Sequence, residues 1–272
     1  MMEQLEWMKY SIALKRCWVH KMSVTIKSQR EIEIMRRAGE ILAITHDEIA
    51  KAIKPGVSTK QIERVAEEVI RSYKCTPSFK GLYDFPGAIC ISVNEEVVHG
   101  IPSKKRILKE GDIVSIDAGV CYKGYHSDAA RTHGVGQISD EANRLIEVTK
   151  QSFFEGMKFA KEGNHLFDIS RAIQQYVESN GFSVVRDLVG HGIGTEVHED
   201  PQIPNFAEKA KGIKLKAGMT LAVEPMVNIG AYDVEWLEDE WTVVTKDHSL
   251  SAHYENTILI TEDGYEILSC TK

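Results

Sequence analysis

The chain repeats itself along its length, and this repeat is the feature that most constrains its fold. Residues 108–117 and 215–224 share an apolar pattern, and each segment ends in an acid. The offset between them is 224 − 117 = 107 residues. Residues 54–64 match residues 161–171 at the same offset. Two matches at one offset predict two copies of a helix-and-strand unit, which we expect to pack around a pseudo-two-fold axis.

The acids that close the two repeats predict a metal site. Asp117 and Glu224 each end an apolar strand, so a pseudo-two-fold axis would bring their carboxylates together. Like charges at short distance are unfavourable unless a cation lies between them. The duplication itself therefore indicates metal binding.

Composition limits the classes of protein that this chain can represent. A length of 272 residues suits one large domain or two small ones, and no linker divides the halves, so we predict one domain. The net charge of −7 argues against a DNA-binding surface. The sequence shows neither a membrane span nor a signal peptide. The five cysteines lack paired C-x-x-C spacing, which indicates reduced thiols and a cytoplasmic location.

The predicted elements follow the order helix, helix, strands in both halves. Capping-box patterns at Ser28 and Ser58 open the first two helices. The expected helices are 28–53, 58–71 and 139–161, with a further helix that resumes after Gly163-Asn164 and runs through 179, and the expected strands are 89–99, 112–121, 125–135, 183–189, 219–227, 241–245 and 253–261. This order predicts an α+β fold in which helices cover one face of a curved antiparallel sheet.

Asp117 and Asp128 flank a predicted hairpin whose turn lies at residues 122–124. In such a hairpin opposed residues have a constant odd sum, and 117 + 128 = 245 is odd. The two acids therefore share one face, either directly opposed or one diagonal step apart. The alternative is a solvated strand face with two unrelated acids.

Further candidate ligands lie on or beside apolar strands. His191 stands between glycines, His198 follows it closely, and Glu255 precedes an apolar strand. Taken singly, each has an ordinary explanation as a core histidine or a salt-bridged acid. Taken together, Asp117, Asp128, Glu224 and Glu255 with His191 would hold two divalent cations. An imidazole among carboxylates favours Mn, Fe, Co or Zn over Ca.

Other motifs are weaker. The glycines around His191 lack the pattern of a phosphate loop or a dinucleotide fingerprint, and no G-x-S-x-G elbow supports a serine hydrolase. The basic runs 104–106 and 209–216 are expected to be solvated loops, with a docking surface for an anionic partner as the alternative.

At this point the chain resembles the type I methionine aminopeptidases, over about residues 23–269. The segments that carry the resemblance are 94–102, 117–119, 128–132, 190–201, 223–225 and 254–257. The resemblance implies the pita-bread fold, with residues 1–22 as an N-terminal extension, helical or disordered, and residues 23–272 as the catalytic metallopeptidase domain.

The resemblance also implies roles for the individual residues. Asp117, Asp128, His191, Glu224 and Glu255 would bind two metal ions, with Asp128 and Glu255 bridging them. A water shared by the metals would be the nucleophile, and Glu224 would carry its proton to the leaving amine. His198 would stabilise the oxyanion, and His99 would contact the substrate near the scissile peptide.

The substrate implied is the N-terminal methionine of nascent polypeptides, followed by a small second residue. By position, the apolar pocket for the methionine would be walled by Phe79, Phe85, Cys90 and Trp241, with Val197 nearby. Leu82 stands where relatives often carry an aromatic residue, which displaces the aromatic to Tyr83, and Val197 replaces a commonly bulkier residue. We expect a cytoplasmic monomer, and transient ribosome contact stays open.

Two rivals remain. A pita-bread relative acting on X-Pro bonds shares the motif around His191, although this chain lacks the separate N-terminal domain usual in that branch. A metal-free binding module on the same fold is the second rival, but such modules typically lose ligands and none is missing here.

Overall fold

The computed structural model describes residues 24–207 and 209–271, so the prediction for residues 1–22 lies outside the described residues. Both predicted helix pairs are present, as α2 (Gln29–Ala52), α3 (Thr59–Ser72), α4 (Asp140–Met157) and α5 (Leu166–Ser179). Ser28 and Ser58 form the predicted capping boxes at the starts of α2 and α3. The capping signals in the sequence therefore located the helix starts correctly.

The internal repeat is confirmed by elements and hydrogen bonds that recur at the 107-residue offset. α3 and α5 coincide residue for residue, since 59 + 107 = 166 and 72 + 107 = 179. The Gly56 N–H donates to Leu108 O at 2.8 Å. Its counterpart, the Gly163 N–H, donates to Leu215 O at 3.1 Å. Both glycines have positive φ, 87° and 92°, a conformation that favours glycine.

The strands form four hydrogen-bonded groups. The first half contributes β1 (Thr76–Pro77), β2 (Cys90–Val93), β3 (Glu96–Val98), β4 (Ile113–Tyr122) and β5 (Tyr125–Gly134). The second half contributes β6 (Ser183–Val184), β7 (Val189–Gly192), β8 (Glu199–Pro204), β9 (Thr220–Val223), β10 (Met226–Asn228), β11 (Val234–Trp236), β12 (Val243–Thr245), β13 (Ser251–His253), β14 (Asn256–Ile260) and β15 (Tyr265–Ile267). The groups are β1-β4-β2 with β5 on β4, β15-β14-β9-β7-β8, β13-β10-β6 and β11-β12-β3, and every pairing is antiparallel.

Hydrogen bonds between β5 and the start of β14 join the two halves. The Asp128 N–H donates to Thr257 Oγ1 at 2.8 Å, and this hydroxyl donates to Asp128 O at 2.9 Å. The Glu255 N–H donates to Ala130 O at 3.0 Å. The junction between the halves therefore lies at two of the predicted metal ligands.

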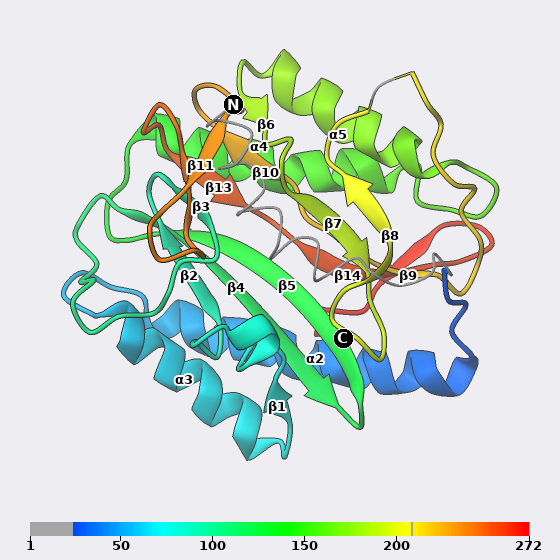
Figure 1. Ribbon diagram of the computed structural model, residues 1–272, viewed down its shortest axis with the longest axis horizontal. Coiled ribbons are helices and arrows are strands. Elements are labelled where there is room, and N and C mark those ends of the chain that lie inside the picture. The colour runs from blue at the N-terminus through cyan, green and yellow to red at the C-terminus, as the bar shows by residue number, and fades with distance from the viewer. Residues whose placement is uncertain (1–23, 208, 272) are drawn as a thin grey trace, which may run out of the picture.

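Each helix pair packs mainly on its own half of the molecule, although Ile32 and Met35 of α2 also join an apolar cluster with Ile193, Leu259 and Leu268, and α4 also contacts β5. α2 lies against β4 and β5, whereas α4 lies against β10 and β13. Figure 1 shows α2 and α3 at the bottom of the view and α4 and α5 at the top, with the β4–β5 hairpin and β14 between them. Each half has its own large apolar cluster. Among the described residues, no helix is both long and apolar enough to span a membrane.

The α+β class is confirmed, but several predicted strands are divided. The segment 89–99 breaks between β2 and β3 at Asn94, which has a φ of 61°. The segment 219–227 breaks at Pro225, which has no N–H to continue a ladder. The segment 183–189 contains only β6 and the first residue of β7. β8, β11 and β15 had no clear sequence pattern, because each is short and half-exposed.

Candidate metal centre

The first half supplies two acids from one hairpin. In the β4–β5 register Asp117 pairs with Ala130 and Gly119 pairs with Asp128. The carboxylates therefore lie one diagonal step apart on the same face, as one of the two predicted arrangements required. The turn of the hairpin is Lys123-Gly124, and both residues have positive φ, at 51° and 80°. Such a turn suits the right-handed twist of the strands.

The second half supplies three further side chains from different strands. His191 lies in β7 opposite Ala222 of β9. Glu224 follows the end of β9, and Glu255 lies between β13 and β14. Ligand atoms of Asp128, His191 and Glu255 lie within 4.8 Å of one another. The structure thus brings residues from both halves into one cluster.

His191 is oriented toward the acids by a backbone hydrogen bond. Its Nδ1 lies 2.9 Å from Gly192 O, so this nitrogen carries the proton and donates. Nε2 is then the ring nitrogen that faces the acids. It lies 3.7 Å from Glu224 Oε1 and 4.0 Å from Asp128 Oδ2. A backbone carbonyl that fixes the ring in this way is typical of metal-binding histidines.

The cluster is electrostatically incomplete without a cation. Within residues 24–207 and 209–271, Asp117 Oδ1, Asp128 Oδ1 and Glu255 Oε1 are buried and accept no hydrogen bond. Burial raises the pKa of Asp117 and of Glu224 to about 7. Burial, together with the neighbouring carboxylates, raises the pKa of Asp128 and of Glu255 well above the usual range. Oxygen atoms and an imidazole in this state fit divalent transition-metal ions.

The two predicted substrate-contacting histidines lie beside this cluster. The rings of His198 and His191 are 4.5 Å apart, edge to face. Burial, together with the charges of neighbouring histidines, lowers the pKa of His198 well below its usual value, and burial lowers that of His99 to about 4. Both imidazoles are therefore neutral at pH 7. His99 also has a φ of 60°, a strained backbone conformation of the kind that clusters at functional sites.

The residues predicted to wall the methionine pocket form one apolar cluster. Phe79, Phe85, Cys90 and Val197 are buried in it, and Leu82, Ile101 and Trp241 pack against them. Cys90 pairs with Asp117 in the β2–β4 register, so this apolar cluster adjoins the acids. Burial and the neighbouring acids raise the pKa of the Cys90 thiol, which keeps the wall neutral.

The two unusual positions occupy defined places around the pocket. Leu82 packs on the apolar cluster, so an aliphatic side chain supplies this part of the wall. Tyr83 is 44% exposed and stacks on His198 with ring centroids 5.8 Å apart. Val197 is 3% exposed and packs within the cluster.

The prediction missed His253, which lies against Glu224. It is 1% exposed, and its Nε2 lies 3.4 Å from Glu224 Oε2. The position two residues before Glu255 at a strand end was the available signal. It was too weak to single out, because the contact depends on the pairing of His253 with Met226 across β13 and β10.

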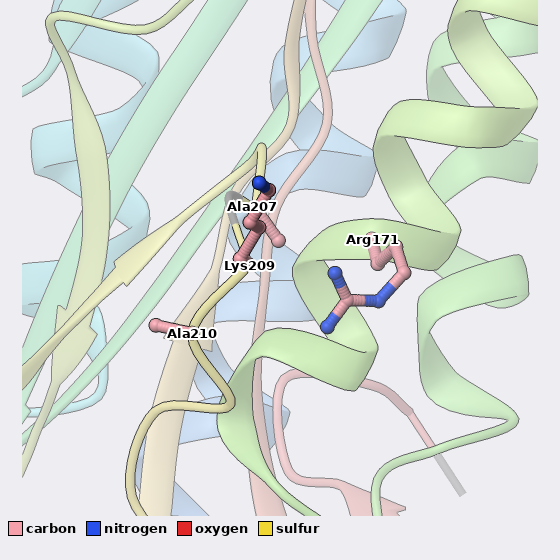
Figure 2. A pocket seen from close by; sticks show the side chains of 4 residues that line it. All are labelled: Arg171, Ala207, Lys209 and Ala210. Carbon is pink, nitrogen blue, oxygen red and sulfur yellow. The ribbon is translucent and has the colours of Figure 1, made fainter.

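The basic runs lie away from the acids. Lys104, Lys105 and the lysines of 209–216 are exposed, as expected for solvated loops. Figure 2 shows Arg171 and Lys209 at an open surface hollow of about 600 Å³, which Ala207 and Ala210 also line. None of the predicted metal or pocket residues is among those that line it.

Fold and cluster together define a metallopeptidase. Residues 33–262 match metallopeptidase family M24, and the chain belongs to this family. The α+β fold and its duplication are the pita-bread arrangement that the resemblance implied.

Within this family the chain is similar to methionine aminopeptidases. It is 57% identical over 249 residues to the methionine aminopeptidase of Clostridium perfringens, a match covering 92% of this chain and 100% of the relative. The crystal structure of methionine aminopeptidase from Thermotoga maritima matches with a TM-score of 0.90 and 47% identity, over 91% of this chain and 100% of that one. A prolidase from Pyrococcus furiosus matches with a TM-score of 0.73 and 25% identity, over 91% of this chain and 66% of that one.

Proposed function

We propose that the protein removes the N-terminal initiator methionine from nascent proteins and peptides, using two divalent cations and preferring a small second residue. The observation that carries this proposal is that the apolar cluster predicted to form the methionine pocket lies directly beside the acids. Cys90 of the pocket and Asp117 of the cluster face each other across one strand pair. A methionine side chain in the pocket would therefore place its own peptide bond at the acids.

Five side chains would hold the cations: Asp117, Asp128, His191, Glu224 and Glu255. The mixture of carboxylates and one imidazole suits Mn, Fe, Co or Zn. When bound, the cations would supply a water of lowered pKa and polarise the scissile carbonyl. Support comes from the orphaned oxygens of Asp117, Asp128 and Glu255, which a cation would satisfy.

Three side chains would act on the attacking water, the developing oxyanion and the substrate backbone. Glu224 is partly open, with its side chain 14% exposed, so it can take a proton from the attacking water and pass it to the leaving amine. His198 is neutral and lies at the edge of the cluster, where its N–H can donate to the developing oxyanion. His99 contacts Trp241 of the pocket, with ring centroids 6.5 Å apart, which suits it to hold the substrate backbone.

The pocket chemistry suits methionine. Aromatic edges such as those of Phe79, Phe85 and Trp241 interact favourably with a thioether. Tyr83 covers one face of His198 and restricts the space where the second residue would lie. A small second side chain would fit this mouth, whereas a larger one would clash.

We expect the reaction to take place in the cytoplasm, with the chain acting as a monomer. In the described part of the chain Cys75, Cys90, Cys121 and Cys270 are free thiols, which is typical of reducing compartments. Transient contact with the ribosome stays a prediction.

The decisive variant is Glu224→Gln. The amide keeps the shape of the side chain but cannot accept the proton, so we expect turnover of Met-Ala-Ser to fall by roughly 10²- to 10⁴-fold. Released methionine is measured with saturating Mn, and Glu262→Gln at an exposed turn is the matched control. Full activity of Glu224→Gln with correct folding contradicts the proposed mechanism.

Two measurements separate the rival functions. Faster cleavage of Met-Pro-Ala than of Met-Ala-Ser would favour an X-Pro peptidase, the activity class of the Pyrococcus prolidase. Elemental analysis after gentle purification tests metal content. Metal near zero, with no activity after adding Mn or Co, would favour a binding module.

A further inference from the structure

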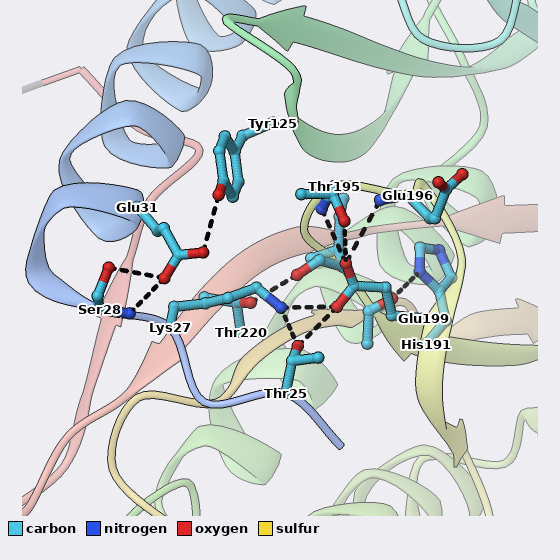
Figure 3. A network of polar contacts seen from close by, with 12 residues as sticks. Thr25, Lys27, Ser28, Glu31, Tyr125, His191, Thr195, Glu196, Glu199 and Thr220 are labelled. Atoms are coloured by element: carbon cyan, nitrogen blue, oxygen red, sulfur yellow. Dashed lines mark hydrogen bonds and ion pairs between the residues drawn. The ribbon is translucent and has the colours of Figure 1, made fainter. Parts of the chain in front are cut away.

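A buried ion pair lies directly beside His198, and the proposed mechanism does not use it. Lys27 Nζ lies 2.6 Å from Glu199 Oε2, and the two side chains are only 4% and 12% exposed. The residues are 172 positions apart in the chain. Figure 3 shows Lys27 reaching from the segment before α2 to the loop that carries Glu199.

The Glu199 carboxylate organises the loop of residues 194–199. Its Oε1 accepts the backbone N–H of Thr195 at 2.8 Å and that of Glu196 at 3.3 Å. Its Oε2 also accepts the Thr25 hydroxyl at 2.8 Å. The loop starts at Gly194, whose carbonyl accepts the His126 N–H of the β4–β5 hairpin at 2.8 Å. One carboxylate thus connects the loop to the segment that precedes α2.

The loop carries two residues of the proposed site between these anchors. Val197 is a buried member of the pocket cluster, and His198 lies against His191. Along the chain, both residues lie between Glu196 and Glu199. The Glu199 carboxylate accepts the backbone N–H of Glu196. Their positions therefore depend on where this carboxylate is held.

Lys27 is itself held in place. Its backbone N–H donates to Gly218 O at 2.8 Å. A Cβ on Gly194 would overlap the Lys27 side chain and the Glu199 carboxylate, so the glycine leaves the space that the pair needs. Burial opposes ionisation of Glu199, but the hydrogen bonds from Lys27 and Thr25 outweigh it, and the pKa of Glu199 lies below its usual value. The Glu199 carboxylate is therefore ionised at neutral pH.

We infer that Lys27 is a positioning residue for the peptidase site. Acting through Glu199, it fixes the loop of residues 194–199, and so aims His198 at the substrate carbonyl and Val197 at the methionine side chain. The inference rests on the proposed function only for its activity readout, because loop order is measured separately.

The test compares Lys27→Met with Arg36→Met. Arg36 also joins the N-terminal part of the chain to the second half, through hydrogen bonds of 2.7 and 2.9 Å to Glu266, but it lies on α2 outside the site. In Lys27→Met we expect amide exchange in residues 194–199 to accelerate at least about tenfold and kcat for Met-Ala-Ser to fall roughly ten- to hundredfold. Mn affinity should stay unchanged, because none of the five proposed ligands belongs to the loop. Arg36→Met should change neither exchange nor kcat.

A second variant covers the case in which Lys27→Met does not fold. Removing one partner leaves a buried unpaired charge, whereas Lys27→Met/Glu199→Gln removes both charges. The double variant should fold and should show the same fast exchange and low kcat. Unchanged exchange and kcat in the folded variant would overturn the inference. If the unmodified protein itself fails to cleave Met-Ala-Ser, the proposed function fails, and loop exchange alone still decides the role of Lys27.

Discussion

The two halves of the molecule share a scaffold and differ in what they attach to it. In each half a glycine at positive φ precedes a capped helix, and the helices α3 and α5 have equal length. The isolated bridges Ser58–Ile107 and His165–Lys214 also match, since 58 + 107 = 165 and 107 + 107 = 214. The duplicated segments therefore give the backbone the same arrangement in both halves.

The two halves differ in structure from the acidic residue of the repeated strand onward. In the first half β4 continues past Asp117 into the hairpin that supplies Asp128. In the second half β9 ends at Val223, because Pro225 follows Glu224 and cannot donate to a ladder. The other candidate ligands of the second half therefore lie elsewhere in its sequence, His191 in β7 and Glu255 between β13 and β14.

The apolar cluster predicted to wall the methionine pocket shows a second difference between the halves. Three of its walls, Phe79, Phe85 and Cys90, come from the first half, in the segment that follows α3. The corresponding segment after α5 forms β6 and β7 and carries His191. The comparison teaches that the duplication placed an acid at the end of the same strand in each half, while the segments that do not repeat supplied apolar residues in the first half and His191 in the second.

After Glu224→Gln, the largest predicted effect is on metal binding, from a substitution at the junction between the two halves. Arg131 of β5 donates to Glu255 O and, at 2.6 Å, to Asn256 Oδ1, and it lies 4.5 Å from the Tyr254 ring centre. Arg131→Met should weaken Mn binding about 10- to 100-fold, as loss of a group that orients a ligand does. Calorimetric titration measures this. Arg131→Lys should not restore it, since lysine lacks the planar fork. Normal affinity in Arg131→Met would mean that Glu255 is held without the first half.

The repeat-related acids give a pH prediction. Asp117 and Glu224 both have a pKa raised to about 7 in the metal-free protein, so below pH 7 both carry a proton that a cation must displace. Affinity for Mn should therefore fall as pH decreases through 7, about tenfold per pH unit for each proton released. Calorimetry in two buffers of different ionisation heat counts the protons. If the affinity for Mn does not depend on pH and no protons are released, neither acid binds the metal.

The smallest predicted effect compares Gly111 with Gly218, which are repeat-related and have φ of 90° and 89°. Alanine at either position is strained by about 1 to 2 kcal/mol. A Cβ at Gly111 would have nothing closer among the described residues than Gln137 O at 3.8 Å, whereas at Gly218 it would meet Ile26 Cγ2 at 2.7 Å. Gly218→Ala should therefore cost about 1 kcal/mol more than Gly111→Ala in the free energy of unfolding. If both variants lose the same free energy of unfolding in denaturant titrations, the segment before α2 shifts without an energetic penalty.

Local features were predictable, and contacts between distant segments were not. Ser28 and Ser58 located helix starts because a capping box needs only four neighbouring residues. The odd sum of the residue numbers placed Asp117 and Asp128 on one face of the hairpin. This prediction was possible because a hairpin, like a capping box, is formed by residues close together in the chain. His253 was missed because its approach to Glu224 requires β10 and β13 to pair, and the stacking of Tyr83 on His198 requires two loops to meet.

The sequence by itself determined the repeat, the helix starts and the five candidate ligands, because periodicity, capping and strand alternation are written in neighbouring residues. Only the tertiary structure decided that Asp128, His191 and Glu255 come together, that an apolar cluster lies beside Asp117, and that Lys27 reaches Glu199. The physical reason is that such contacts join residues far apart in the chain, by 63 positions for Asp128 and His191 and by 172 for Lys27 and Glu199. Their formation depends on burial and hydrogen bonding in the assembled fold, which leaves no local pattern in the chain.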